Sequence, residues 1–172
     1  MIKLITGAVV LAGCAALGMF FASGFRRRVQ QLVELENVFA QLEFDIDYLS
    51  IPLDESFEKA AKNSCGAISE MFLYITDRLR KNRCCDMQMV WKRAIDRSKD
   101  DLFLSDDDKR ILTDFSKTLG SGNKEKEKNN IKMTLMRLKL AEDEARTAAE
   151  CNVKMYRGLG ILTGVFIVIV LI

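Results

Sequence analysis

The chain has 172 residues, a net charge of +2 and no histidine. A net charge so close to zero argues against a general nucleic-acid binder, and the absence of imidazole removes the commonest general base and metal ligand. A single proline and abundant Leu, Ala, Glu, Lys and Met predict an all-α protein. The five cysteines, an odd number without framework spacing, indicate free thiols in an intracellular protein.

The chain opens with an uncharged stretch, residues 4–25, that ends at three arginines. As a helix rising ~1.5 Å per residue, this stretch is long enough to cross a bilayer core of ~30 Å. Lys and Arg mark the cytoplasmic side, so the residues after Arg28 are expected in the cytoplasm. A signal peptide is one alternative, and a lipobox-like Leu11 to Cys14, with Cys14 acylated, is another. Because the apolar run continues well beyond Cys14, a retained transmembrane helix is favoured.

Amphipathic helices are expected through the middle of the chain, because apolar residues recur there at three- and four-residue steps. The first ends at Ile51-Pro52, since a residue before proline avoids helical backbone angles. Ser105 and the three aspartates after it are typical of a helix N-cap, whereas a calcium loop would need alternating ligands and a glycine turn. The expected helices cover 28–50, about 53–62, 67–80, about 86–97, 111–119 behind the cap, and 124–156.

The long polar helix over 124–156 has a narrow apolar seam, and the aliphatic tail 158–172 is expected to return to the membrane. A buried core helix is the alternative for this short tail. Basic residues flank both apolar ends on the side of the central domain, so both termini are expected outside. The fold class is therefore all-α: a cytoplasmic helical bundle of about five to six helices over 26–157, between transmembrane helices over 4–25 and 158–172. The basic residues that indicate this membrane topology, called the topology residues below, are Arg26, Arg27, Arg28, Lys154 and Arg157.

No set of residues for catalysis stands out. A Ser-His-Asp or Cys-His arrangement needs histidine. Asp45 and Asp47 are expected on opposite sides of their helix and do not make a carboxylate pair. The neighbouring Cys84 and Cys85 have no second cysteine pair to complete a zinc site. The chain is therefore expected not to be an enzyme and to bind neither cofactor nor metal.

With this layout, the chain resembles the stage III sporulation protein AB family of endospore-forming bacteria over nearly its full length. The helix with the pattern Pro-Leu-x-x-Ser-Phe is also similar to half-units of the inner-membrane platform protein of type II secretion and type IV pilus systems. Where that family tends to carry an acidic residue and a glutamine after its Leu-Gly, this chain has Asn123 and Glu127. The order and spacing of short motifs carry the resemblance: Leu42-Glu43 with Ile46 and Tyr48, Ile51-Pro52-Leu53 before Phe57, Trp91 with Ala94, Leu119-Gly120, and Lys154-x-Tyr156-Arg157-x-Leu159-Gly160.

The resemblance implies a non-enzymatic platform or assembly component in the mother-cell membrane facing the forespore, within a secretion-like transenvelope channel complex. Its implied partners are a cytoplasmic secretion-type ATPase, other membrane proteins of the complex and membrane lipid, but no nucleic acid; a homo-oligomer stays open. The ATPase contact is expected at a basic turn or along the long polar helix, with a merely solvated charged face as the alternative. The candidate residues are Arg78, Arg80, Lys81, Arg83, Lys124, Lys126 and Lys128.

Two other classes of function stay open. One is a membrane-anchored adaptor with an unrelated cytoplasmic partner. The other is a small channel or transporter subunit unrelated to sporulation, which is disfavoured because the predicted spans carry no ionisable residue that would mark an ion path.

Overall fold

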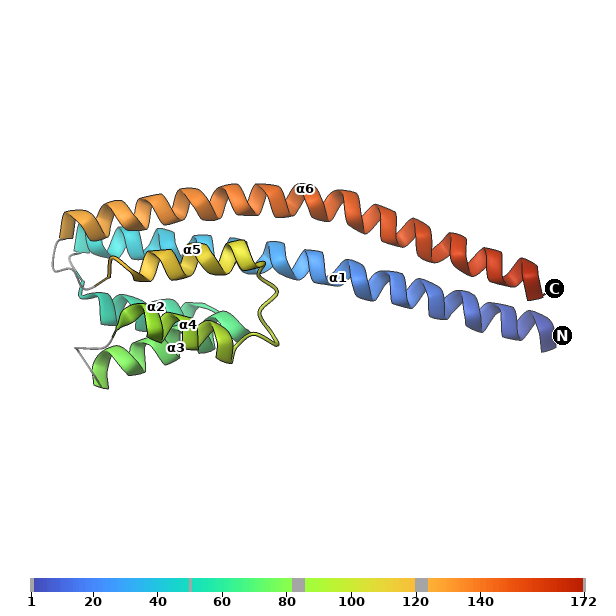
Figure 1. Ribbon diagram of the computed structural model, residues 1–172, viewed down its shortest axis with the longest axis horizontal. Helices are drawn as coiled ribbons and strands as arrows, with labels where there is room; N and C mark the ends of the chain where they lie inside the picture. Colours follow the sequence, from blue (N-terminus) through green and yellow to red (C-terminus); the bar gives the residue numbers. More distant parts are fainter. Residues whose placement is uncertain (1, 50, 82–85, 120–123, 172) are drawn as a thin grey trace. The chain divides into compact units, whose positions relative to one another are not determined.

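The computed structural model describes residues 2–49, 51–81, 86–119 and 124–171, without the side chains of 2–12, 14–22, 124, 156–157, 159–161 and 163–171. The described residues fold into helices and no strand, which confirms the all-α class for this part of the chain (Figure 1). The helices are α1 (Ile2–Phe44), α2 (Leu53–Asn63), α3 (Gly66–Lys81), α4 (Met87–Arg97), α5 (Asp106–Ser116) and α6 (Lys124–Leu171), with a π-helical turn at Asp45–Leu49.

The starts of the short helices follow local signals in the sequence. Pro52 directly precedes α2, where its missing N–H leaves no helical bond unmade. Helix α3 begins at Gly66, whose φ of 53° is rarely adopted by residues with a Cβ. Ser105 and Asp108 form a capping box on α5: the Asp108 N–H donates to Ser105 Oγ (3.2 Å) and the Ser105 N–H donates to Asp108 Oδ2 (2.9 Å). The capping interpretation of the aspartate run is therefore confirmed.

Helix α1 joins the apolar and amphipathic segments, a continuation that their sequence allowed, and α6 is longer than the helix expected over 124–156. Helix α1 runs without a break from the apolar stretch into the amphipathic one, and α6 continues past Gly158, where the polar helix was expected to end. Neither helix contains proline, and an isolated glycine such as Gly24 or Gly158 costs a helix only about 1 kcal/mol. A local glycine was therefore too weak a signal for a helix end.

The chain divides into two compact units. One contains Met1–Val29 and Glu144–Ile172, that is, the beginning of α1 and the end of α6. The other, called the bundle below, contains Gln30–Asp143: the rest of α1, helices α2 to α5 and the start of α6. The bundle holds every candidate surface described below.

An aromatic cluster forms the centre of the bundle, with a ring from each of α1 to α5. Trp91 of α4 is fully buried and lies 5.9 Å from Phe57 of α2 and 5.8 Å from Phe72 of α3, measured between ring centroids. Phe115 of α5 lies 5.4 Å from Trp91 and 4.8 Å from Phe39 of α1. Edge-to-face pairs of this kind add about 0.5–1.5 kcal/mol each to the burial of apolar area. One cluster thus connects five helices.

Ion pairs join the start of α6 to the end of α1 and the π-helical turn. Successive pairs step four and then seven residues forward along α6 and equally far back along α1, which is the pattern of an antiparallel register. Ile131 and Leu138 form the fully buried face of α6, as the apolar seam predicted. The N–O distances are 2.9 Å for Lys128–Asp47, 3.8 Å for Lys132–Glu43 and 3.5 Å for Lys139–Glu36.

Two polar side chains of α1 hold the connections between shorter helices. Gln31 binds the segment between α4 and α5 from both ends of its amide: Nε2 donates to the Asp101 carbonyl (2.8 Å), and Oε1 accepts from the Phe103 N–H (2.7 Å). Glu34 accepts a bond from the Cys65 N–H (2.6 Å) directly before α3, where unpaired N–H groups and the helix dipole favour negative charge. Both connections are therefore fastened to α1.

The end of α1 differs from the continuous helix expected as far as residue 50. Asp45–Leu49 form the π-helical turn, after which the Ile51 N–H donates to the Asp45 carbonyl (3.2 Å). The Asp45 side chain is completely buried and accepts from Gln41 Nε2 (2.8 Å), whereas Asp47 pairs with Lys128. The two carboxylates thus take different partners, but the burial of Asp45 was not predicted.

The membrane spans expected over 4–25 and 158–172 stay predictions. Within the part of the chain that the structure describes, no helix is both long enough and apolar enough to cross a membrane.

Substituting Trp91→Ala should destabilise the bundle by about 3–5 kcal/mol, because it removes the shared ring of the cluster and leaves a cavity. Urea unfolding of the full chain, followed by circular dichroism, measures the change. The control Leu73→Ala alters a side chain that is half exposed and should cost far less. Equal losses for the two variants would contradict the central role of the cluster.

Glu58 of α2 links its own helix to α3. It accepts charge-assisted hydrogen bonds from Lys62 and from Arg80 of α3. These bonds, with that of Lys62 the stronger, hold the pKa of the Glu58 carboxyl below its usual value. A carboxyl with a lowered pKa stabilises the fold above its unfolded-state pKa and loses this contribution as the pH falls through the folded-state pKa.

Glu58→Gln should therefore be less stable than the parent chain at neutral pH and equal to it in acid. Urea midpoints measured at several pH values test this expectation. The matched control is Glu70→Gln on α3, an exposed carboxylate for which the described residues offer no ion pair; it should follow the parent chain throughout. If Glu58→Gln is still less stable to urea than the parent chain in acid, the loss of stability comes from altered packing and not from the lost charge.

Candidate partner-binding surfaces

Tyr74 and two arginines form an exposed basic surface where α3 packs against α4. The guanidinium carbon of Arg78 lies 5.2 Å from the centre of the Tyr74 ring, and that of Arg97 lies 5.8 Å from it. Both distances are within the ~6 Å range of cation–π attraction. In the described part of the chain neither arginine has a carboxylate within salt-bridge distance. The basic surface, defined as Tyr74, Arg78 and Arg97, can therefore accept an acidic group from outside.

The other cations of the predicted basic turn are paired within the protein. Arg80 binds Glu58, and Lys81 Nζ lies 2.8 Å from Asp77 Oδ1. Both cations remain largely exposed, so these pairs add little to stability. Arg83 lies outside the described residues. Among the described cations of the predicted basic turn, Arg78 is thus the one that the tertiary structure places beside a second cation, Arg97.

The predicted lysines at the start of α6 differ in their surroundings. Lys128 is hydrogen-bonded to Asp47, which raises the pKa of its ammonium group. This lysine serves the α1–α6 register and is a structural residue. Lys126 is exposed, and the side chain of Lys124 lies outside the described residues.

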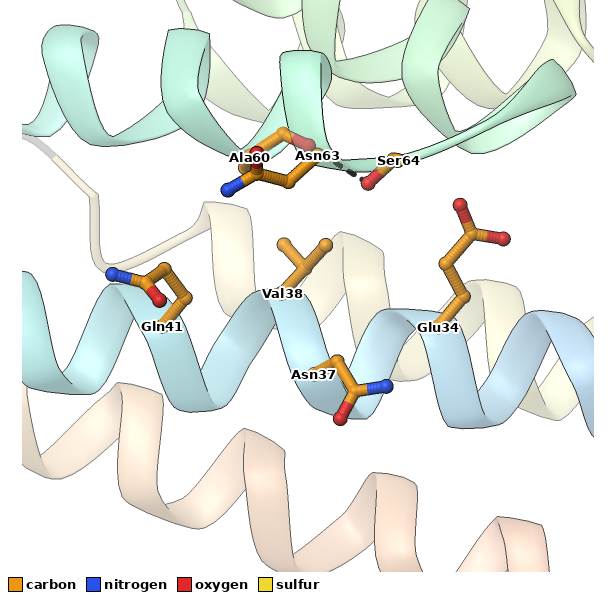
Figure 2. A pocket seen from close by; sticks show the side chains of 7 residues that line it. All are labelled: Glu34, Asn37, Val38, Gln41, Ala60, Asn63 and Ser64. Atoms are coloured by element: carbon orange, nitrogen blue, oxygen red, sulfur yellow. Dashed lines mark hydrogen bonds between the residues drawn. The ribbon is translucent and has the colours of Figure 1, made fainter.

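A small polar pocket lies between α1 and α2, with a volume of about 230 Å³ (Figure 2). The Glu34 carboxylate is already bound to the Cys65 N–H, and the Ser64 hydroxyl donates to the Ala60 carbonyl (2.8 Å). Figure 2 shows Glu34, Val38 and Gln41 of α1 pointing toward α2, whereas Asn37 points away from it. Because the Glu34 carboxylate and the Ser64 hydroxyl already have partners within the protein, we interpret the pocket as a polar contact between the two helices. Its lining residues are Glu34, Asn37, Val38, Gln41, Ala60, Asn63 and Ser64.

Among the residues that the structure describes, the remaining predicted positions form no further site. Cys65 and Cys151 are exposed free thiols, while Cys84, Cys85 and the side chain of Cys14 lie outside the described residues. Within the described ranges, no group of three or more Cys, Asp or Glu side chains is placed to hold a metal ion. Of the predicted topology residues, Arg26, Arg27 and Lys154 are exposed, Arg28 is half-buried and the side chain of Arg157 is outside the description.

Sequence reasoning missed Tyr74 and Arg97. The i, i+4 spacing of Tyr74 and Arg78 on one helix was a usable signal, because residues at this spacing are neighbours on a helix surface. Arg97 had no such signal, since it reaches the ring only through the packing of α4 against α3.

Comparison with known proteins agrees with the resemblance predicted from the motifs. The family profile of stage III sporulation protein AB matches residues 3–172. Stage III sporulation protein AB of Bacillus subtilis (strain 168) is 26% identical over 171 residues, which is 99% of each chain. A solved structure of stage III sporulation protein AB matches with a TM-score of 0.64 at 26% identity, covering 72% of this chain and 97% of that chain. The chain therefore belongs to the stage III sporulation protein AB family.

Proposed function

We propose that this protein is a non-enzymatic platform of a transenvelope complex built during sporulation, in the mother-cell membrane facing the forespore. In this proposal, residues 4–25 and 158–172 span the membrane, and the domain between them docks a cytoplasmic secretion-type ATPase. Membership of a sporulation protein family supports the setting. The similarity of the Pro52–Phe57 segment to secretion platform proteins supports the role.

The observation that carries the ATPase contact is the basic surface of Tyr74, Arg78 and Arg97. Contact with one ring restrains both guanidinium groups before any partner arrives, so less side-chain entropy is lost on binding. The neighbouring α3 residues Phe72 and Ile75 are fully buried, so the core holds the helix that carries Tyr74 and Arg78. Carboxylates on an ATPase would form charge-assisted hydrogen bonds with this surface.

The charge pattern of the chain supports the membrane attachment. An uncharged stretch at each end is bordered by basic residues on the side of the central domain, as expected when that domain stays in the cytoplasm. Two anchors would hold the docking surface near the bilayer, where a platform must receive its ATPase.

The ATPase contact is tested with the full chain in neutral lipid nanodiscs and a secretion-type ATPase from the same organism. Arg78→Glu/Arg97→Glu should weaken binding roughly tenfold or more, because the variant sets like charges against the ATPase carboxylates. Binding of the parent chain should also weaken with added salt. Biolayer interferometry measures both effects.

The matched control is Lys109→Glu/Arg110→Glu, which changes the net charge equally on α5 and removes only the exposed pairs with Asp106 and Asp107. It should bind like the parent chain. If both variants lose binding, the interaction depends on the net charge of the chain and not on the basic surface. If the parent chain does not bind, ATPase docking is contradicted.

The membrane proposal predicts that the full chain stays in the membrane pellet through an alkaline carbonate wash, since two spans bury their apolar residues in the hydrocarbon layer. A chain lacking 1–25 and 158–172 should move to the supernatant. Release of the full chain by the wash would contradict both spans.

A further inference from the structure

An apolar stripe runs along the outer face of α6 in the bundle. Met133, Met136 and Leu140 follow one another at steps of three and four residues and therefore lie on one side of the helix. Their exposed fractions are 53%, 65% and 65%. The packed face of α6, with the fully buried Ile131 and Leu138, lies on the opposite side. We call the three exposed residues the α6 stripe.

The α6 stripe has the pattern of a helix-docking surface. Single exposed apolar residues are ordinary, but three in line along one helix match the i, i+3, i+7 anchors by which amphipathic helices recognise one another. Methionine suits such a surface, because its unbranched and polarizable side chain adapts to the shape of a partner.

Cations border the stripe on both sides. Lys132 and Lys139 lie toward α1, and Arg137 lies toward α5. Each is about half exposed, and its carboxylate partner within the chain is 3.5–3.8 Å away. Such distances are long for a hydrogen bond, and exposed pairs are worth at most about 1 kcal/mol. All three cations can therefore bind a further carboxylate beside the stripe.

We propose that the α6 stripe docks an amphipathic helix of a partner protein that carries acidic side chains on both flanks of its apolar face. The apolar residues of that helix would cover Met133, Met136 and Leu140, and its carboxylates would reach the cations on either side. A second copy of this chain fits less well. Its own α6 would bring the same cations against these ones in either orientation, and like charges at an interface are repelled.

This surface is separate from the basic surface on α3. Within the bundle, α6 and α3 lie on opposite sides (Figure 1), and the α6 stripe is apolar where the other surface is cationic. The inference does not rest on the proposed function, and the ATPase takes no part in its test.

The test uses the full chain in neutral phosphatidylcholine nanodiscs and three labelled helical peptides of equal length. One carries leucine at the a and d positions of each heptad and glutamate at e and g. The second replaces the glutamates by lysine, and the third replaces the leucines by serine. Fluorescence anisotropy, with empty nanodiscs as the blank, should show binding of the leucine–glutamate peptide and roughly tenfold weaker binding of the other two.

Met136→Glu/Leu140→Glu should weaken binding of the leucine–glutamate peptide roughly tenfold or more, since it places charge in the centre of the docking face. The matched control Leu73→Glu/Met89→Glu adds the same two charges at half-exposed apolar side chains of α3 and α4 and should bind like the parent chain. Circular dichroism confirms that each variant is folded.

Three results would overturn the proposal. The first is no binding of the leucine–glutamate peptide to the parent chain. The second is binding that Met136→Glu/Leu140→Glu leaves unchanged. The third is a parent chain that is dimeric by mass photometry and becomes monomeric in this variant, which would assign the stripe to a second copy of the chain.

Discussion

Trp91 is completely buried, touches rings from α2, α3 and α5, and reaches α1 through Phe115. Its indole N–H is buried without a hydrogen-bond partner among the described residues, so the ring packing outweighs the cost of one unpaired polar group. The position of α3 against α4 depends on this cluster. That packing brings Tyr74 of one helix and Arg97 of the other within cation–π distance, so the basic surface is a consequence of the core.

Helix α6 shows how one helix can serve two purposes. With 3.6 residues per turn, residues such as Ile131 and Leu138 face the interior, while Met133 and Met136 face outward. Ile131 and Leu138 are buried on the inner side of α6, and the ion pairs with α1 follow the antiparallel register of the two helices. The apolar residues on the outer face therefore add nothing to this packing, and their arrangement needs an explanation in terms of a partner.

Membership of the sporulation family and the arrangement of the bundle are compatible with an assembly component that meets several partners. The two candidate surfaces differ in chemistry: one offers guanidinium groups held by a ring, and the other offers an apolar line bordered by cations. Surfaces of different chemistry select different partners. The partners of the two proposals would therefore not compete for one surface.

The sequence by itself determined the all-α class, the starts of α2 and α3 and the N-cap of α5, because capping residues, proline, glycine and hydrophobic periodicity act locally. The family followed from the resemblance carried by the order and spacing of short motifs. The expected bounds of 111–119 for the helix behind the cap differ from those of α5, Asp106–Ser116. It also located Arg78 within a run of basic residues, but the expected basic turn is the last turn of helix α3 for Arg78, Arg80 and Lys81. Only the tertiary structure decided that Arg97 joins Arg78 at Tyr74, that Asp45 is buried in a π-helical turn and that Lys128 is tied to Asp47. These contacts join residues from different helices or depend on a local distortion, and neither helical periodicity nor residue spacing encodes which helix faces lie together. The continuity of α6 through Gly158 was likewise outside local reasoning, since the cost of one glycine is small against a long helix.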